Sequence, residues 1–283
     1  AAGERPRPPG LHTAGVRRVK LNVGDVELNV EEWGAGEPLL LVHGLGANVH
    51  LWVHQIPEFS RRYRTIAVDL RGFGASDKPR APGAYAVATL AADVAAVLGA
   101  LGLERVIYLG TSMGGYVGLA LALAEPGLCR ALVLCHTAAR RRMPADVLAA
   151  RVATLRTAPM DEYGRLVASQ ALAPGADRAL TDWLANMVAS NDREAYAAVL
   201  SEGLAGFDVM ERLGEVQVPT LVIVGEHDRV VMPEEGREMA RRIPGARLLT
   251  LGGVGHIGYA ERPEAFNRAV LEFLEDIGAP RRG

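Results

Sequence analysis

The chain has little cysteine, few aromatic residues and no long hydrophobic run. Its two cysteines, Cys129 and Cys135, flank one apolar segment, which excludes a disulfide framework and predicts small core residues. Apolar runs such as 39–42 and 117–124 are far shorter than the roughly 20 residues that a membrane-spanning helix needs. We therefore expect a soluble protein with no membrane partner.

Basic and acidic residues are also nearly balanced in number. The 31 basic and 33 acidic residues leave a formal net charge of -2, which gives no electrostatic reason to expect a nucleic-acid partner. Residues 1–17 are rich in Pro and Gly and lack the apolar core of a secretory signal. We expect them to form a disordered lead-in, and a cytoplasmic location follows by default.

Strand-like segments alternate with helical patterns along much of the chain. Eight segments have this composition: 18–23, 26–33, 38–42, 65–68, 106–109, 131–134, 220–224 and 247–251. The first two alternate apolar and polar residues around Gly24 and Asp25, which is typical of an antiparallel hairpin with one wet face. The later runs are continuously apolar, as in LLLV and TLVIV, which is typical of parallel strands covered by helices on both faces. The sequence therefore predicts an α/β fold with an eight-stranded, mostly parallel sheet.

The segment 137–216 breaks this alternation. Its pattern is helical, with turn signals such as Pro144 and Pro159 and no convincing strand. Roughly 80 residues are far too many for an ordinary connection between two strands. We expect a helical cap over one end of the sheet, inserted between two parts of an α/β core, 18–136 and 217–277.

The stretch VIYLGTSMGGYVGLALALAEP places Ser112 between a buried strand and a helical pattern, within the motif Gly-Thr-Ser-Met-Gly. In a nucleophile elbow the turn is so tight that side chains two residues before and after the serine would strike neighbouring backbone, so Gly110 and Gly114 are needed there. The alternative is that Ser112 only caps the following helix, as serines often do.

A nucleophilic serine needs a base, and the base needs an acid that orients it. Asp228 follows the strand-like TLVIV run, and His256 lies in a glycine-rich loop after the next strand, just before the final helix. Both positions are at the carboxyl ends of strands, where α/β sheets build their sites. Glu226 competes for the role of the acid, and we favour Asp228 because it lies deeper in the loop.

An acyl-transfer site also needs donors for the negative charge of the tetrahedral intermediate. The segment His43-Gly44-Leu45-Gly46 follows an early buried strand, and its glycines allow backbone N–H groups to turn toward a ligand. We predict that the backbone amides of Leu45 and Met113 form the oxyanion hole. His43 is expected to brace this loop, and His227 is interpreted as incidental.

Together the motifs HGLG, DLRGFGASDKP, GTSMGG, GEHD and GVGH, in this order, resemble those of an α/β-hydrolase over about residues 19–275. The resemblance implies Ser112 as nucleophile, His256 as base, Asp228 as orienting acid, a cap at 137–216, and no cofactor. A serine at this position argues against epoxide hydrolases and haloalkane dehalogenases, which use Asp.

The passage from 130 to 156 is similar to the strand-to-cap segment of 3-oxoadipate enol-lactonases, which open a carboxylate-bearing lactone. That resemblance implies that Arg140, Arg141 and Arg142 lie near the pocket mouth, and that one of them, with Arg140 as the candidate, pairs with a substrate carboxylate through two hydrogen bonds. A solvated basic face is the alternative. His136 departs from the family pattern, where Asn or Ser is expected. Trp52, His136 and Trp183 are further candidate contacts, and core positions are the alternative for Trp52.

The first functional hypothesis is a hydrolase that cleaves a small-molecule ester or lactone through an acyl-enzyme. A carbon–carbon hydrolase of an activated diketone would use the same triad, and a non-catalytic ligand receptor on this fold is the third reading. His50 and His54 have the spacing of a helical metal pair, but no intervening Glu supports a zinc motif, so no metal is predicted. A homo-oligomer is left open.

Overall fold

The sheet begins with the antiparallel hairpin that the alternating residues predict. Strands β1 (Arg17–Asn22) and β2 (Glu27–Trp33) pair antiparallel. The computed structural model describes residues 15–141 and 143–278, so most of the predicted lead-in, residues 1–17, lies outside the described residues. Within that segment, Arg17 already belongs to β1.

The remaining strands extend the sheet in parallel. They are β3 (Pro38–Val42), β4 (Arg64–Val68), β5 (Val106–Thr111), β6 (Cys129–Cys135), β7 (Thr220–Gly225) and β8 (Arg247–Leu251). The spatial order is β1-β2-β4-β3-β5-β6-β7-β8, with β2 antiparallel to β4 and all later pairs parallel. This confirms the predicted eight-stranded, mostly parallel sheet, and every strand end lies within one or two residues of its predicted position.

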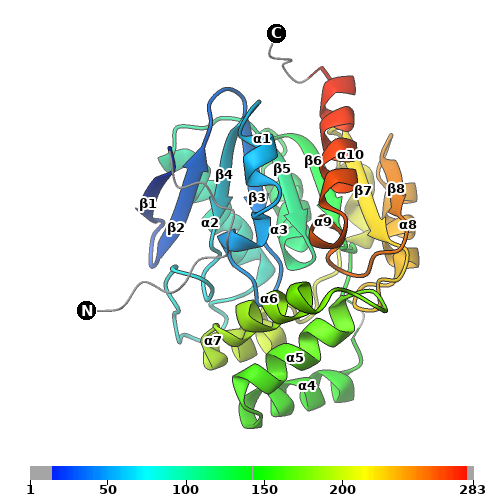
Figure 1. Cartoon of the computed structure of the whole chain (residues 1–283). Helices are drawn as coiled ribbons and strands as arrows, with labels where there is room; N and C mark the ends of the chain where they lie inside the picture. Colours follow the sequence, from blue (N-terminus) through cyan, green and yellow to red (C-terminus); the bar gives the residue numbers. More distant parts are fainter. Residues whose placement is uncertain (1–14, 142, 279–283) are drawn as a thin grey trace.

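Helices cover both faces of this sheet (Figure 1). Helices α1 (Ile56–Phe59) and α10 (Pro263–Asp276) lie on one face, and α2 (Val87–Ala100), α3 (Met113–Ala124) and α8 (Pro233–Arg242) lie on the other. The short helices η1 (Val49–Trp52) and α9 (Gly258–Glu261) follow loops at the sheet edge where the parallel strands end. Within the described part of the chain, no helix combines the length and the apolar character needed to cross a bilayer.

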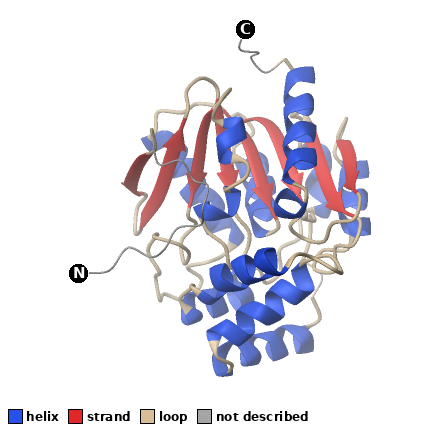
Figure 2. Cartoon of the chain, in the orientation of Figure 1, coloured by secondary structure: helices blue, strands red, loops and turns tan. Residues whose placement is uncertain are grey.

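A group of helices lies at the carboxyl ends of the parallel strands, as Figure 2 shows. Between β6 and β7 the chain forms α4 (Ala145–Thr157), α5 (Met160–Ala171), α6 (Arg178–Ala189), α7 (Arg193–Ala198), η2 (Val199–Gly203) and η3 (Met210–Glu215). No named strand occurs in the described residues of this stretch. The proposed cap, residues 137–216, comprises these helices.

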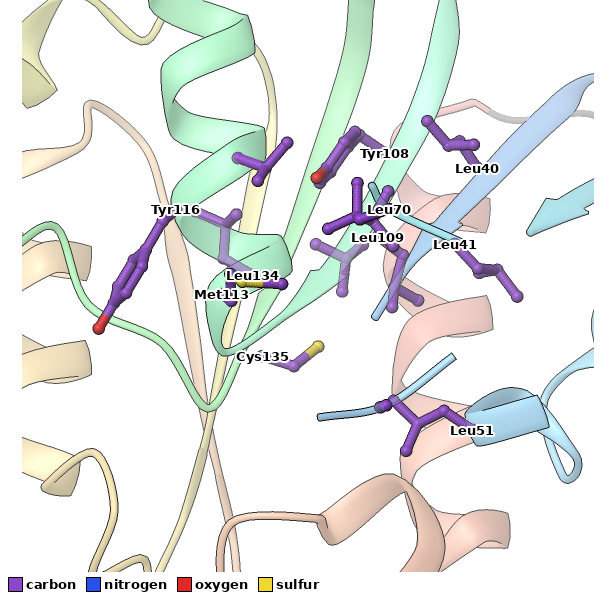
Figure 3. Packing of buried hydrophobic residues seen from close by; sticks show 14 of the residues in the cluster. Leu40, Leu41, Leu51, Leu70, Tyr108, Leu109, Met113, Tyr116, Leu134 and Cys135 are labelled. Carbon is purple, nitrogen blue, oxygen red and sulfur yellow. The ribbon is translucent and has the colours of Figure 1, made fainter. Parts of the chain in front are cut away.

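The core is densest around β5 and α3. Every residue of β5 is buried, and α3 is buried on nearly all sides because the sheet, α2 and the cap surround it. Figure 3 shows Leu109 of β5, Met113 at the start of α3, and Leu134 and Cys135 of β6 among the apolar side chains of this cluster. Both cysteines are free and buried, as predicted. The turn between β5 and α3 is thus held between two buried elements.

Candidate active site

Ser112 occupies the turn between β5 and α3 in a strained conformation. Its φ of 51° and ψ of -117° lie outside the regions that L-residues prefer, at a cost of about 1–3 kcal/mol. Two hydrogen bonds hold this backbone: the Ser112 amide donates to the Cys135 carbonyl at 2.9 Å, and Oγ1 of Thr137 donates to the Ser112 carbonyl at 2.8 Å. The turn is therefore pinned to the end of β6.

The glycines around Ser112 have the steric reason that the motif predicts. A Cβ on Gly110 would lie 2.3 Å from the carbonyl oxygen of Gly114, and a Cβ on Gly114 would lie 2.3 Å from that of Val42. Both contacts are with backbone, which has no room to move. The strand and the helix pack too closely at this turn for any side chain at either position.

The structure does not support the alternative in which Ser112 only caps α3. Ser112 stands at the N-cap position, but its side chain accepts no capping hydrogen bond. The amide of Gly115 instead donates to the backbone carbonyl of Ser112 at 2.9 Å. The hydroxyl is therefore not engaged by the first turn of α3, and the side chain is only partly buried.

Asp228 and His256 lie in loops that follow β7 and β8, and they are in direct contact. The Nδ1 atom of His256 is 2.8 Å from Oδ2 of Asp228, and both residues are buried. The other carboxylate oxygen, Oδ1, accepts hydrogen bonds from the amides of Val230 at 2.9 Å and Val231 at 3.0 Å. This geometry orients the imidazole, with its second nitrogen left to act as a base.

The electrostatics of Asp228 keep the carboxylate ionised. Burial, the largest influence, would raise its pKa, but the nearby imidazoles of His256 and His136 together hold the pKa of Asp228 well below its usual value. The acid therefore remains an anion over the neutral pH range. An anionic acid can stabilise an imidazolium that forms during a proton transfer.

Glu226, the competing acid, has another role in the structure. Its Oε2 atom accepts a hydrogen bond from the amide of Gly253 at 2.8 Å, and its side chain is about half exposed. His227 lies 3.8 Å from the same carboxylate. Glu226 thus braces the loop that leads to His256, whereas Asp228 contacts the imidazole itself.

The loop after β3 lies directly against Ser112. A Cβ on Gly44 would lie 3.1 Å from Cβ of Ser112 and 3.8 Å from its Oγ. Among the described residues, neither the amide of Leu45 nor that of Met113 donates a hydrogen bond to another protein atom. These two N–H groups are the ones that we predict to bind an oxyanion.

His43 braces this loop, as predicted. Its Nε2 accepts a hydrogen bond from the amide of Leu70 at 3.0 Å, so its Nδ1 carries the proton that is donated to the carbonyl of Gly44 at 2.8 Å. The ring is fully buried, and this burial lowers its pKa. A neutral imidazole therefore fixes the conformation of the loop.

Hydrogen bonds between the cap and the loop that carries His256 could not be predicted from the sequence. Glu261 of α9 accepts hydrogen bonds from the amides of Ala173, after α5, and Gly255, beside His256, both at 2.7 Å. The amide of His256 itself donates to the carbonyl of Ala171 at 2.6 Å. The cap and the loop of the base are thus joined, and no motif marks the residues that join them.

The predicted substrate contacts occupy varied environments. Trp52 is fully buried and packs on Tyr259, with ring centroids 5.2 Å apart, and Trp183 of α6 is half-buried against the core. Arg140 lies 3.6 Å from Glu238 of α8. His136 is buried beside Asp228, at 3.4 Å. A role in substrate binding stays a prediction for all four residues.

His136, Asp228 and His256 form a cluster whose nitrogen and oxygen atoms lie within 4.8 Å of one another. Such a set can hold a metal ion only if both Nδ1 atoms lose their protons. The amide of Gly258 donates to Nε2 of His136 at 3.2 Å, which leaves the proton on Nδ1 of that ring. The protons on these rings therefore favour contacts with the Asp228 carboxylate over the binding of a metal ion. The absence of a metal stays a prediction.

Comparison with known proteins agrees with this geometry. Residues 37–263 match the family model described as alpha/beta hydrolase fold. The chain belongs to the α/β-hydrolase family. This membership accounts for the sheet order and for the position of Ser112 between β5 and α3.

Individual members of the family resemble the chain over nearly its whole length. It is 32% identical to 3-oxoadipate enol-lactonase 2 of Acinetobacter baylyi over 88% of this chain and 94% of that protein. It is also 32% identical to 2-hydroxy-6-oxo-2,4-heptadienoate hydrolase of Pseudomonas putida, over 89% of this chain and 94% of that one. The enol-lactonase from Burkholderia xenovorans superposes with a TM-score of 0.84 at 30% identity, covering 91% of this chain and all of its own.

Proposed function

We propose that this α/β-hydrolase is a serine hydrolase that cleaves a carboxylic ester or lactone through an acyl-enzyme. The observation that carries the proposal is the strained backbone of Ser112, whose side chain lies against the Gly44–Gly46 loop. His256 and Asp228, which are hydrogen-bonded at 2.8 Å, supply the base and the acid that such a serine needs. Strain of this kind persists where it serves a function, because ordinary packing would relax it. The carboxylate that orients the imidazole also accepts hydrogen bonds from two backbone amides.

In the proposed reaction the hydroxyl of Ser112 attacks the substrate carbonyl carbon, and its proton passes to Nε2 of His256. Asp228 stabilises the resulting imidazolium. The carbonyl oxygen becomes an oxyanion and accepts hydrogen bonds from the amides of Leu45 and Met113, aided by the positive end of the α3 dipole. His256 then gives the proton to the leaving alcohol. A water molecule, deprotonated by His256, then attacks the carbonyl carbon of the acyl-enzyme. The bond to Oγ of Ser112 breaks, the acid is released, and His256 returns the proton to Ser112.

The choice of ester or lactone rests on the similarity to two enol-lactonases at 32% and 30% identity. An enol-lactone is a cyclic ester, and its carbonyl suits the same oxyanion donors. A substrate carboxylate would need a cation near the site. Arg140 has Glu238 at 3.6 Å, so it would have to exchange that partner for the substrate.

A second candidate is hydrolysis of a carbon–carbon bond in an activated diketone. The 32% identity to 2-hydroxy-6-oxo-2,4-heptadienoate hydrolase favours it, since nearly the whole length of the chain takes part in the match. The triad serves either reaction, so the substrate and not the geometry separates them. A ligand receptor without turnover is less well supported, because it would not need a strained nucleophile.

The test is an activity panel of p-nitrophenyl esters, simple lactones and a vinylogous diketone, each in neutral and carboxylate-bearing form. Wild type and Ser112→Ala are measured side by side, with Ser169→Ala as the matched control because Ser169 is exposed on α5. We expect turnover of esters or lactones in wild type and in Ser169→Ala, and a loss of about a thousandfold or more in Ser112→Ala. Full activity in Ser112→Ala would refute the proposal. Turnover of the diketone alone would favour the second candidate.

A further inference from the structure

His136, directly after β6, is a buried histidine that takes no part in the proton transfers of the proposed reaction. It is 1% exposed, and its φ of 49° makes it, with Ser112, one of two described non-glycine residues in the left-handed region. Its amide donates to the carbonyl of Ile223 at 2.8 Å. Its backbone is thereby fixed to β7, the strand that leads to Asp228.

The hydrogen bond at Nε2 determines where the proton of the His136 ring lies. The amide of Gly258 donates to Nε2 at 3.2 Å, and a ring nitrogen accepts only when it carries no proton. Burial lowers the pKa of His136, although the nearby Asp228 acts in the opposite direction, so the ring is neutral. A neutral ring with an accepting Nε2 carries its proton on Nδ1.

The Nδ1 atom of His136 lies close to the acid of the triad. Nδ1 of His136 is 3.4 Å from Oδ2 of Asp228, the same oxygen that accepts from His256 at 2.8 Å. The contact does not have the geometry of a hydrogen bond, and among the described residues Nδ1 of His136 has no hydrogen-bond partner. Since Oδ1 accepts from the amides of Val230 and Val231, each oxygen of the carboxylate faces two N–H groups.

The same side chain also contacts the loop of the base. Gly258 is two residues after His256, and a Cβ on Gly258 would lie 3.0 Å from Nε2 of His136. The rings of His136 and His256 are 5.8 Å apart, nearly edge to face. The ring of His136, directly after β6, thus lies beside Asp228 in the loop after β7 and contacts Gly258 at the start of α9, two residues after His256.

We propose that His136 is a positioning residue that fixes the acid and the base of the triad relative to each other. Its Nδ1–H holds Oδ2 of Asp228 in line with His256, and its Nε2 holds the amide of Gly258. Because two separate loops carry Asp228 and His256, a shared contact limits their relative movement more than either loop does alone. This inference rests on the serine-hydrolase function proposed above.

Two substitutions separate the two contacts of the ring. In His136→Asn the side-chain nitrogen takes the place of Nδ1, so the donor to Asp228 is kept and the acceptor for Gly258 is lost. In His136→Gln the side-chain oxygen takes the place of Nε2, so the reverse holds. His136→Leu removes both contacts, and His54→Leu, at an exposed position, is the control. Asn tolerates positive φ better than Gln or Leu, so the urea midpoint of each variant is measured first.

We measure kcat and KM on the best ester of the panel. We expect kcat to fall about tenfold to a hundredfold in His136→Gln and His136→Leu, with KM changed less than about twofold, because misplacement of the acid affects the transition state more than binding. His136→Asn should restore kcat to within about threefold of wild type. Among variants whose urea midpoints agree, neither a space-filling role nor the backbone strain at φ 49° would produce this rescue.

The second readout is the downfield proton resonance of His256 Nδ1–H in the NMR spectrum, identified by its absence in His256→Gln. We expect it in wild type, His54→Leu and His136→Asn, and we expect it to shift upfield or broaden in His136→Leu. A folded His136→Leu with wild-type kcat and an unchanged resonance would overturn the inference, as would an equal loss in the Asn and Leu variants. The resonance needs no turnover, so it decides the role of His136 even if Ser112→Ala shows the serine-hydrolase proposal to be wrong.

Discussion

Asn191, in the turn after α6, donates a 2.7 Å hydrogen bond from its side-chain amide to the carbonyl of Gly46 in the loop after β3. The same amide donates to the carbonyls of Met187 and Val188, so it also closes the end of α6. Tyr196 lies so close to Gly46 that a Cβ there would be 2.6 Å from its ring. The cap therefore supports the loop whose Leu45 amide we propose as an oxyanion donor.

Replacing Asn191 by Ala should lower kcat about threefold to tenfold while KM changes less. The loss should be smaller than the hundredfold or more that follows removal of an oxyanion donor, because the Leu45 amide is displaced and not deleted. Steady-state kinetics on the best ester measures this effect. Asn186→Ala, at an exposed position on the same helix, is the control. An Asn191→Ala protein that folds and keeps its full kcat would show that the loop needs no support from the cap.

Gly114→Ala should destabilise the protein by about 1–3 kcal/mol, since its Cβ would strike the carbonyl of Val42 at 2.3 Å. Gly99→Ala is the matched variant: it is an exposed helical position in α2 where an added Cβ would meet nothing within 4 Å, and it should gain roughly 0.5–1 kcal/mol. Urea unfolding of the two variants gives both values. Equal stabilities would contradict the tight packing of the nucleophile turn.

The protein should lose stability as the pH falls below about 6.5. Burial lowers the pKa of His43 and of His136 from the usual 6.5, so in this range the unfolded chain binds protons that the folded protein does not. Their contribution is thus fully present above pH 6.5 and decreases toward pH 5. His136→Asn should reduce this slope by at most about 1.4 kcal/mol per pH unit. Urea midpoints between pH 8 and 5 test it, and an unchanged slope in His136→Asn would contradict a neutral ring.

Asp93→Ala should cost about 3–5 kcal/mol, because it leaves the buried guanidinium of Arg71 without its main partner. Both side chains are at most 4% exposed, and Asp93 accepts from Nε of Arg71 at 2.5 Å and from its Nη2 at 2.6 Å. Asp161→Ala, which breaks an exposed pair with Arg165, should cost less than about 1 kcal/mol. Thermal or urea unfolding compares them, and similar losses would show that burial does not govern these pairs.

The segment that contains Arg71 holds contacts that its sequence pattern does not indicate. In the sequence the run DLRGFGASDKP contributes only to the resemblance to the family. In the structure its Asp69 accepts hydrogen bonds from the amides of Val49 and Ala75 and from the side chain of Asn29. A carboxylate with three donors is a structural brace for the loops around it. The donors come from three separate segments, and no local pattern connects them.

Much of the architecture followed from local rules that the sequence alone expresses. Continuous apolar runs predicted the buried parallel strands, because a strand covered on both faces has no polar side. The glycines around Ser112 predicted a tight turn, because backbone packing at 2.3 Å admits no side chain. The sequence patterns that predict these features are local, and the features appear at the predicted residues.

Only the tertiary structure decided how distant side chains are paired. Asp228 and Glu226 are both candidates for the acid in the sequence, and in the fold Asp228 contacts His256 whereas Glu226 accepts a hydrogen bond from the amide of Gly253. In the sequence His136 is only a departure from a family pattern. In the fold it lies 3.4 Å from Asp228, although the two residues are 92 positions apart and the cap lies between them. Such contacts form at the carboxyl ends of β6, β7 and β8. These ends lie side by side because the three strands are neighbours in the sheet, and no single segment of the sequence specifies that order.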